Sequence, residues 1–381
     1  MDKPLLSIAV PTKNRYYYLK YLIKLVASFG SDEIELVVQD NSDDNTEIKE
    51  FLEKNPYDFV RYYHNYGIIS MTGNCDLAIG NCHGKYICMI GDDDGVTRYI
   101  LDCVKWMEEN SFTILKSSYS IYKWPSFKSS RYFNVSATAL CSNYTMKYEL
   151  RNCKSALSKL LKSGISTLEY MPKLYNGIVR RDVLDRVYAK CGSYSPGPSP
   201  DMANAVSIAL EEENYVFIDA PIIIGGQSAH LGGDANKYKN KICRLEDQKI
   251  IDPKDVEAWD ARIPKIWAAM AVWPASALSA LKKYNATDYI NKTDFDKVYK
   301  VFIYEHPTVK NLAYELSSNK IRLKINGVFY KIYRFVKGFV SVLNYKLFNV
   351  MGGLKINYGV QDIIEAEAIF VKGIKDFNPQ K

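Results

Sequence analysis

Three consecutive carboxylates, Asp92-Asp93-Asp94, follow a short apolar run and are the side chains of this sequence best suited to chemistry. Like charges this close repel one another, so a fold accepts them only where solvent or a cation balances the charge. Alternate residues of an extended chain point the same way, which would place Asp92 and Asp94 on one side. Carboxylate oxygens suit Mg²⁺ or Mn²⁺, which bind through one or two carboxylates together with substrate phosphates. A solvated acidic turn without a metal is the alternative.

A second polar run, Asp40-Asn41-Ser42-Asp43-Asp44, follows the apolar residues 34–38. Ser, Asp and Asn are preferred at helix N-caps, and capping would explain Ser42 or Asp44. Capping does not explain Asp40, which stands at the end of the expected strand. A carboxylate there could accept hydrogen bonds from a nucleotide base or a ribose.

Elements that alternate between strand and helix must position these residues. Short apolar runs predict strands, and amphipathic stretches with a helical period lie between them. This alternation indicates βαβ units, that is, an α/β fold with a mostly parallel sheet and helices on both faces. Ligands of such sheets bind beyond the carboxyl ends of the strands, so the polar loops should converge on one crevice. The expected strands are 5–10, 34–38, 59–63 and 85–90.

With these motifs in place, the sequence resembles the family-two glycosyltransferases, whose GT-A fold is Rossmann-like. Five motifs in matching order carry the resemblance, and together they are more specific than any one alone. The close match covers residues 5–95, weakens to residue 230 and is absent beyond. The motifs are Pro11-Thr12-x-Asn14-Arg15, Asp40-Asn41-Ser42-x-Asp44, Asn65-x-Gly67, Asn74 leading to Gly84-x-Tyr86-Ile87, and the DXD motif Asp92-Asp93-Asp94.

The resemblance implies roles for individual residues. Asp94 would hold Mn²⁺ or Mg²⁺, which bridges the diphosphate of a nucleotide sugar. The residues implied in donor binding are Pro11, Thr12, Asn14, Arg15, Asp40, Asn74, Asp92 and Asp93.

Two further residues are implied by the resemblance in the less similar middle region. Asp201, in Pro198-Ser199-Pro200-Asp201, matches the carboxylate that acts as base in inverting members. Asp is also a common N-cap, so capping alone is the other interpretation. His230, in a glycine-rich loop, corresponds to a third metal ligand in some GT-A enzymes, and a surface or core histidine is its alternative.

The expected function is therefore an inverting, metal-dependent glycosyltransferase. The donor would be a nucleotide sugar, with a UDP-sugar favoured, and the acceptor a hydroxyl of a glycan or polyprenyl-linked saccharide, as in surface-polysaccharide biosynthesis. One alternative is a nucleotidyltransferase, although that class usually begins with a Gly-rich basic loop and residues 11–15 contain no glycine. The other is a non-catalytic, membrane-associated scaffold that binds nucleotide sugars.

Length and composition set the expected organisation and compartment. A chain of 381 residues predicts two domains, or one domain with a large extension. The expected division is a catalytic domain over 1–235 and a mainly helical region over 236–381. Eight cysteines without Cys-x-x-Cys or zinc spacing favour reduced thiols and a cytoplasmic location. The first residues lack the pattern of a signal peptide, and no apolar run reaches the roughly 18–20 residues of a membrane span.

A basic segment at about 320–350 holds most of the excess positive charge. Eight Lys and Arg residues and no acidic residue lie between Glu315 and Asp362. Apolar residues recur there at helical spacing, which predicts an amphipathic basic helix. This helix would lie on the inner membrane face or pack on the catalytic domain or a partner subunit. Nucleic-acid binding is not expected, because the catalytic half is not basic.

Overall fold

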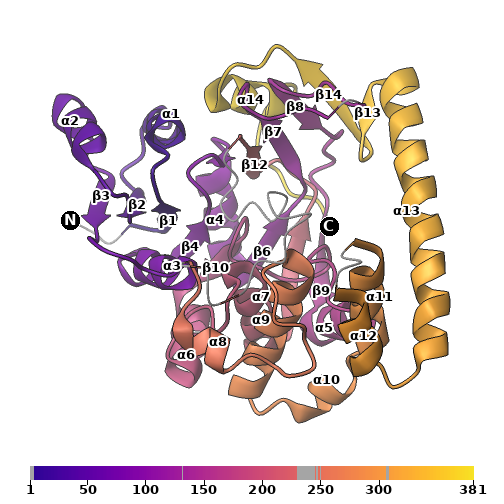
Figure 1. Ribbon diagram of the computed structural model, residues 1–381. Helices are drawn as coiled ribbons and strands as arrows, with labels where there is room; N and C mark the ends of the chain where they lie inside the picture. Colours follow the sequence, from indigo (N-terminus) through magenta and orange to yellow (C-terminus); the bar gives the residue numbers. More distant parts are fainter. Residues whose placement is uncertain (1–3, 131, 230–244, 246–247, 249, 306–308) are drawn as a thin grey trace.

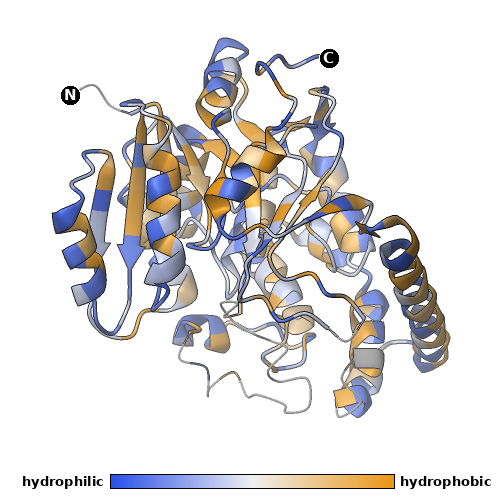
Figure 2. Cartoon of the chain, turned by 90° about the horizontal axis from the view of Figure 1, so that it is seen from above, coloured by the Kyte–Doolittle hydropathy of each residue, from blue (hydrophilic) through white to orange (hydrophobic). Residues whose placement is uncertain are grey.

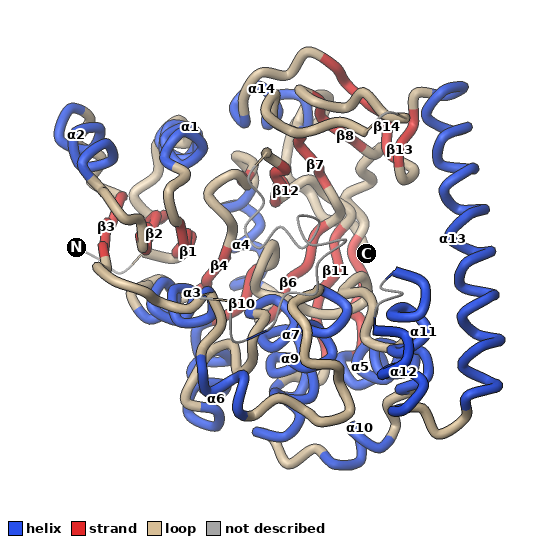
Figure 3. The backbone as a smooth tube through the Cα atoms, viewed as in Figure 1, coloured by secondary structure: helices blue, strands red, loops and turns tan. Residues whose placement is uncertain are grey.

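The computed structural model describes residues 4–130, 132–229, 245, 248, 250–305 and 309–381. In these residues the strands form two sheets, and helices surround the larger one (Figures 1 and 3). The predicted domain boundary at about 235 lies outside the described residues.

The larger sheet has eight strands, and its first four in spatial order are parallel. Later strands are mixed, since β10 runs antiparallel to both its neighbours and β9 runs antiparallel to β11. The strand order is β3 (Val60–His64), β2 (Ile34–Asp40), β1 (Leu6–Thr12), β4 (Tyr86–Met89), β10 (Ile178–Arg180), β6 (Ile114–Ser117), β11 (Asn214–Ile218) and β9 (Tyr148–Asn152).

Helices cover both faces of this sheet, because its central strands are apolar on both sides. Side chains of a strand alternate between faces, so Ile8 and Val10 pack with one set of helices and Ala9 with the other. Figure 2 shows these strands largely in the hydrophobic colour. The first set is α1 (Tyr16–Ala27), α2 (Thr46–Lys54) and α4 (Ile100–Glu109), and the second is α3 (Met71–Gly80), α5 (Cys153–Lys162), α6 (Arg181–Cys191) and α7 (Pro200–Glu211). The predicted α/β class is confirmed.

A second, six-stranded sheet joins segments that are far apart in the sequence. Its strand order is β13 (Val350–Met351), β14 (Leu354–Tyr358), β8 (Thr138–Cys141), β7 (Ser120–Lys123), β12 (Ile223–Gln227) and β5 (Gly95–Val96). The apolar run 216–224 thus contributes to two sheets, because the chain leaves β11 and passes Pro221 before β12 begins. The C-terminal α14 (Ile363–Phe370) packs beside this sheet on α1.

The region beyond residue 250 is mainly helical, as predicted, but it also contains the hairpin β13–β14. Asn349, just before β13, and Gly352 and Gly353, in the turn between β13 and β14, all have positive φ. No helix among the described residues is long and apolar enough to cross a membrane. The helices are α8 (Pro253–Glu257), α9 (Ala269–Lys283), α10 (Thr287–Asn291), α11 (Phe295–Glu305), α12 (Lys310–Leu316) and α13 (Lys320–Phe348).

Gly84 precedes β4 at a point where the chain lies directly against β1. A Cβ on Gly84 would stand 2.6 Å from the backbone nitrogen of Ser7. We expect Gly84→Ala to lower the free energy of unfolding by about 1–3 kcal/mol, because overpacking forces the strands apart. Thermal or urea unfolding measures this change.

The matched control is Gly80→Ala at the end of α3, where an added Cβ meets nothing within 4 Å. It should be neutral or slightly stabilising, since alanine is the better helix former. Equal effects of the two substitutions would contradict the close approach at Gly84.

Candidate functional site

The acidic run Asp92–Asp94 lies at the carboxyl edge of the larger sheet and is buried. It follows β4, next to the end of β1, where the Thr12 hydroxyl donates to Asp92 Oδ2 at 2.7 Å. The loop after β2 lies against the loop after β1, because the Asn14 amide donates to Ser42 Oγ at 2.7 Å. The loops that were expected to converge therefore do so.

Arg15 connects this edge to a distant loop. Its Nε lies 3.1 Å from Asp92 Oδ1 and its Nη2 lies 2.6 Å from Asp93 Oδ2. The same Nη2 donates to Ser228 Oγ at 2.7 Å, and Ser228 donates to Asp93 at 2.7 Å. Burial opposes the charge of the guanidinium, but Asp92 and Asp93 outweigh it and raise the pKa of Arg15. Arg15 is therefore a permanent cation inside the acidic cluster.

Asp94 is held differently, by neutral donors. It accepts hydrogen bonds from the backbone nitrogens of Gly91 at 2.7 Å and Gly226 at 2.6 Å, and from the Tyr175 hydroxyl at 2.9 Å. Burial is the largest cause that raises the pKa of Asp92 and of Asp94, to about 7, and repulsion from Asp93 adds to it. The ion pairs of Arg15 reach only Asp92 and Asp93, so an ionised Asp94 has no ion-pair partner among the described residues.

This excess of negative charge fits a divalent cation. Among the described residues no three His, Cys, Asp or Glu side chains form a ready metal cluster. Mg²⁺ and similar ions need only one or two carboxylates when substrate phosphates complete the coordination. Asp94 and Asp92 have the right oxygen chemistry and charge for that task.

Asp40 has no exposed surface in this structure. Its Oδ2 accepts from the hydroxyls of Tyr16 and Tyr62, each at 2.7 Å, and its Oδ1 accepts from the Ser42 amide at 2.8 Å. Burial raises the pKa of both tyrosines far above their ordinary value. Asp40 thus shapes the turn after β2, and its contact with a donor stays a prediction.

Asn74 lies in α3 beneath the ends of two strands. Its Nδ2 is 3.3 Å from the carbonyl of Gln39 and 3.5 Å from that of Thr12. Its Oδ1 is buried and has no hydrogen-bond partner among the described residues. An unpaired buried acceptor is costly, so this oxygen is suited to a donor group of a ligand.

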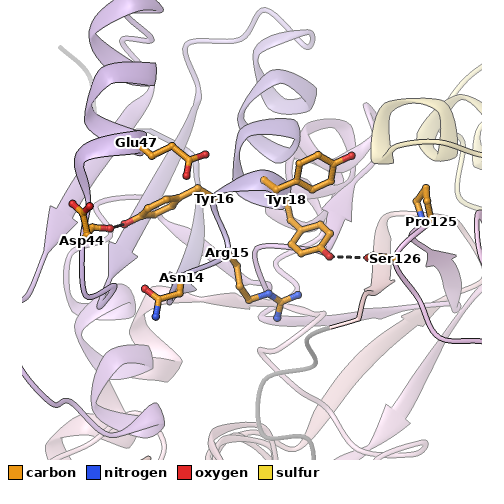
Figure 4. Close-up of a pocket in the computed structure, with 9 residues that line it drawn as sticks. Asn14, Arg15, Tyr16, Tyr18, Asp44, Glu47, Pro125 and Ser126 are labelled. Atoms are coloured by element: carbon orange, nitrogen blue, oxygen red, sulfur yellow. Dashed lines mark hydrogen bonds between the residues drawn. The ribbon is translucent and has the colours of Figure 1, made fainter.

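A cavity of about 630 Å³ opens beside these loops (Figure 4). Asn14 and Arg15 line it on one side, and Pro125 and Ser126 of the segment after β7 lie opposite. The Tyr18 hydroxyl bridges the two sides through a 2.7 Å hydrogen bond to Ser126. Pro11 and Thr12 lie just before these residues, at the end of β1.

Asp201 lies in the first turn of α7, where its Oδ1 accepts from the Met202 amide at 2.8 Å and from the Ser199 hydroxyl. Ser199, not Asp201, occupies the N-cap position of α7, and no side chain caps this helix, so the capping interpretation of Asp201 is wrong. Catalysis by Asp201 stays a prediction. His230, the other predicted residue of the middle region, lies outside the described residues.

Lys173 and Tyr175 belong to the site but escaped the sequence analysis. Burial lowers the pKa of Lys173 below its ordinary value, and the nearby carboxylates of Asp201 and Asp94 offset this only in part. Lys173 Nζ lies 5.5 Å from the ring centre of Tyr119, and no carboxylate of the described residues forms an ion pair with it. A buried ammonium near Asp94 and Asp201 can meet an anionic ligand there. No motif marks these residues, because they lie in an irregular segment before β10.

Comparison with known proteins identifies the N-terminal region. Residues 7–164 match the family model "Glycosyl transferase family 2". No curated protein matches the sequence. Among solved structures, this one is similar to S. aureus TarS 1-349 in complex with UDP-GlcNAc (14% identity, 94% of this chain and 97% of that chain, TM-score 0.45). It is also similar to the mannosyltransferase PcManGT from Pyrobaculum calidifontis in complex with GDP-Man and Mn²⁺ (16% identity, 86% and 88%, TM-score 0.40).

The buried carboxylates predict a linked dependence on pH and metal. The folded protein retains protons on Asp92 and Asp94 that the unfolded chain loses between pH ~4 and ~7. This contribution to stability therefore falls as pH rises through that window. A cation needs the ionised carboxylates, so Mn²⁺ should raise the melting temperature more at pH 8 than at pH 6.

In Asp94→Asn the Mn²⁺ shift should shrink at both pH values, as differential scanning fluorimetry would measure. Asp43→Asn, in the exposed neighbouring loop, is the control and should retain the shift. A shift that is independent of pH and unchanged in Asp94→Asn would rule out this site.

Proposed function

We propose that this chain, a family-two glycosyltransferase as residues 7–164 identify it, moves a sugar from a nucleotide-sugar donor to an acceptor hydroxyl with inversion. The donor is a UDP-sugar, and the acceptor is a glycan or a lipid-linked saccharide of surface-polysaccharide biosynthesis in the cytoplasm. The observation that carries the proposal is the convergence of Thr12, Arg15 and Asp92–Asp94 on one strand edge.

The donor lies against the loops at this edge, with its base toward Asn74 and its diphosphate toward Asp94. Asp94, with Asp92 nearby, would hold Mn²⁺ or Mg²⁺, and the cation would supply positive charge against the departing nucleoside diphosphate. Arg15 holds Asp92 and Asp93 in place through two ion pairs. His230 as a further metal ligand is part of the same proposal.

Asp201 takes the proton of the acceptor hydroxyl. The new bond forms from that oxygen to the anomeric carbon as the bond to the diphosphate breaks on the opposite side, and one displacement inverts the centre. A carboxylate is an intrinsically weak base at neutral pH. It accepts the proton late, when positive charge on the sugar has made the hydroxyl acidic, as in glycoside hydrolysis.

Lys173 adds a second positive charge to the site. It lies where both Asp94 and Asp201 act on its charge, which suits a contact with the donor diphosphate. Such a contact is a charge-assisted hydrogen bond, stronger than a neutral one.

A thermal-shift panel of nucleoside diphosphates and their sugars, with and without Mn²⁺, tests the donor site. A ligand at 100 times its Kd stabilises the fold by about 2.7 kcal/mol. We expect a metal-dependent shift with uridine nucleotides. No shift with any nucleotide would favour the non-catalytic scaffold.

With that donor, Asp201→Asn should keep the thermal shift and lower transfer by about 10²–10⁴-fold, the usual contribution of a general base. Asp102→Asn is the control, since Asp102 is an exposed carboxylate in the first turn of α4. Transfer retained in Asp201→Asn would show that Asp201 has only a structural role in the first turn of α7.

Lys173→Met should weaken nucleoside diphosphate binding by about 10-fold or more, the equivalent of a charge-assisted hydrogen bond. Its melting temperature should not fall, because burial of this ammonium is unfavourable to the fold. Isothermal titration and unfolding measure the two quantities separately.

Lys116→Met is the matched control at a second buried lysine. Lys116 Nζ donates to the carbonyls of Leu168 and Glu169, so its loss should lower stability because two acceptors lose their donor. If Lys173→Met instead destabilises the fold and leaves binding unchanged, Lys173 is structural.

A further inference from the structure

Helix α13 runs along one edge of the molecule and is anchored near its two ends (Figure 1). At its start Leu323 is buried and Gly327 lies against Ile303 of α11. Near its end Tyr345 contacts Phe133, with ring centroids 5.2 Å apart, and its hydroxyl hydrogen-bonds the backbone of Asn134. Between these anchors residues 331–340 are all exposed.

The anchors define which side of the helix faces the protein. Each residue turns the helix by about 100°, so Leu323, Gly327 and Tyr345 lie within about 40° of one another. The apolar face lies within an arc of about 140°, whose middle is about 165° from the anchors. It therefore points away from the protein. Its residues are Ile321, Ile325, Val328, Phe329, Ile332, Phe335, Val336, Phe339, Val340, Leu343 and Leu347.

The side chains of this face are exposed to an unusual degree. Ile321 is 76% exposed, Phe335 75% and Phe329 66%. Figure 2 shows the hydrophobic and hydrophilic colours alternating along this outer helix. Contiguous exposed apolar surface of this extent marks a contact with another apolar phase.

The charge of this segment indicates whether the apolar face contacts a second copy of the chain or a lipid surface. The segment 316–361 contains eight basic residues and no acidic one, and at about 100° per residue Lys324 and Lys331 lie just outside one edge of the apolar arc. In a two-fold dimer this segment would meet its own copy, and the like charges would repel without a carboxylate to neutralise them. An anionic lipid surface supplies both the apolar phase and the negative charge.

We propose that α13 lies in the plane of an anionic lipid bilayer, with its apolar face among the acyl chains and its basic residues among the headgroups. The helix attaches the chain to one leaflet without crossing it. This inference stands on the geometry of α13 and does not depend on the transfer reaction.

Co-sedimentation of the full chain with phosphatidylcholine vesicles, with and without phosphatidylglycerol, tests the proposal. Binding should require phosphatidylglycerol and weaken with added salt. The variant Phe335→Glu with Phe339→Glu should lower binding at least tenfold. Both side chains are exposed, so its circular dichroism and melting temperature should match the parent.

The matched control is Leu150→Glu with Tyr188→Glu, which makes the same charge change at exposed apolar positions on β9 and α6. Its binding should equal that of the parent. Equal loss in both double variants would overturn the proposal, because charge alone would then explain the effect.

A second pair of variants isolates the electrostatic contribution. Lys331→Gln with Lys337→Gln should weaken binding to the anionic vesicles by about fivefold for each charge removed. Lys154→Gln with Lys375→Gln, exposed elsewhere, should have little effect. Equal weakening in the two variants would contradict a specific role of α13.

The oligomeric state tests the alternative that a second copy of the chain covers the apolar face of α13. Light scattering should show that the parent and the Phe335→Glu, Phe339→Glu variant have the same mass. The proposal is wrong if the parent does not bind vesicles and forms a dimer, whereas the Phe335→Glu, Phe339→Glu variant is a monomer. A second copy of the chain would then cover the apolar face.

Discussion

The ion pairs of Arg15 with Asp92 and Asp93 allow this fold to keep three carboxylates in its interior. A buried charge without a partner costs several kcal/mol, so an uncompensated acidic cluster would destabilise the sheet edge. Arg15 begins the turn into α1, and its guanidinium also reaches Ser228 beyond β12. One side chain therefore joins the first loop of the larger sheet to the acidic run and to the second sheet.

The second sheet supports Asp94 from the other side. β5 follows the acidic run directly and pairs with β12, which brings the Gly226 amide to Asp94. A Cβ on Gly226 would stand 1.7 Å from the carbonyl oxygen of Asp93, so only glycine fits there. Trp124 of the same sheet region donates its indole N–H to that carbonyl at 2.8 Å. Asp94 is thus held by groups that carry no charge of their own.

The C-terminal region serves two separate purposes. Its last helix, α14, completes the support of the site, because Ile363 packs where Gly95 leaves no room for a side chain. Glu367 of α14 pairs with Arg98 through hydrogen bonds of 2.7 and 2.8 Å. The preceding α13 instead turns its apolar face outward. Two successive helices of one segment therefore differ: α14 packs into the core, and α13 is the helix for which we propose attachment to a lipid surface.

The sequence by itself determined the parallel half of the larger sheet and the loops that end its strands. Apolar runs and helical periods are local signals, and parallel strands bring their carboxyl ends together wherever they lie in the chain. Tertiary structure alone decided that Ser228 and Tyr175 meet the acidic run, that Lys173 lies near Asp94 and Asp201, and that β13–β14 joins a sheet with β5. These contacts join residues far apart in the chain, so no local pattern encodes them. The outward turn of α13 is of the same kind, since periodicity predicts an apolar face but not what that face meets.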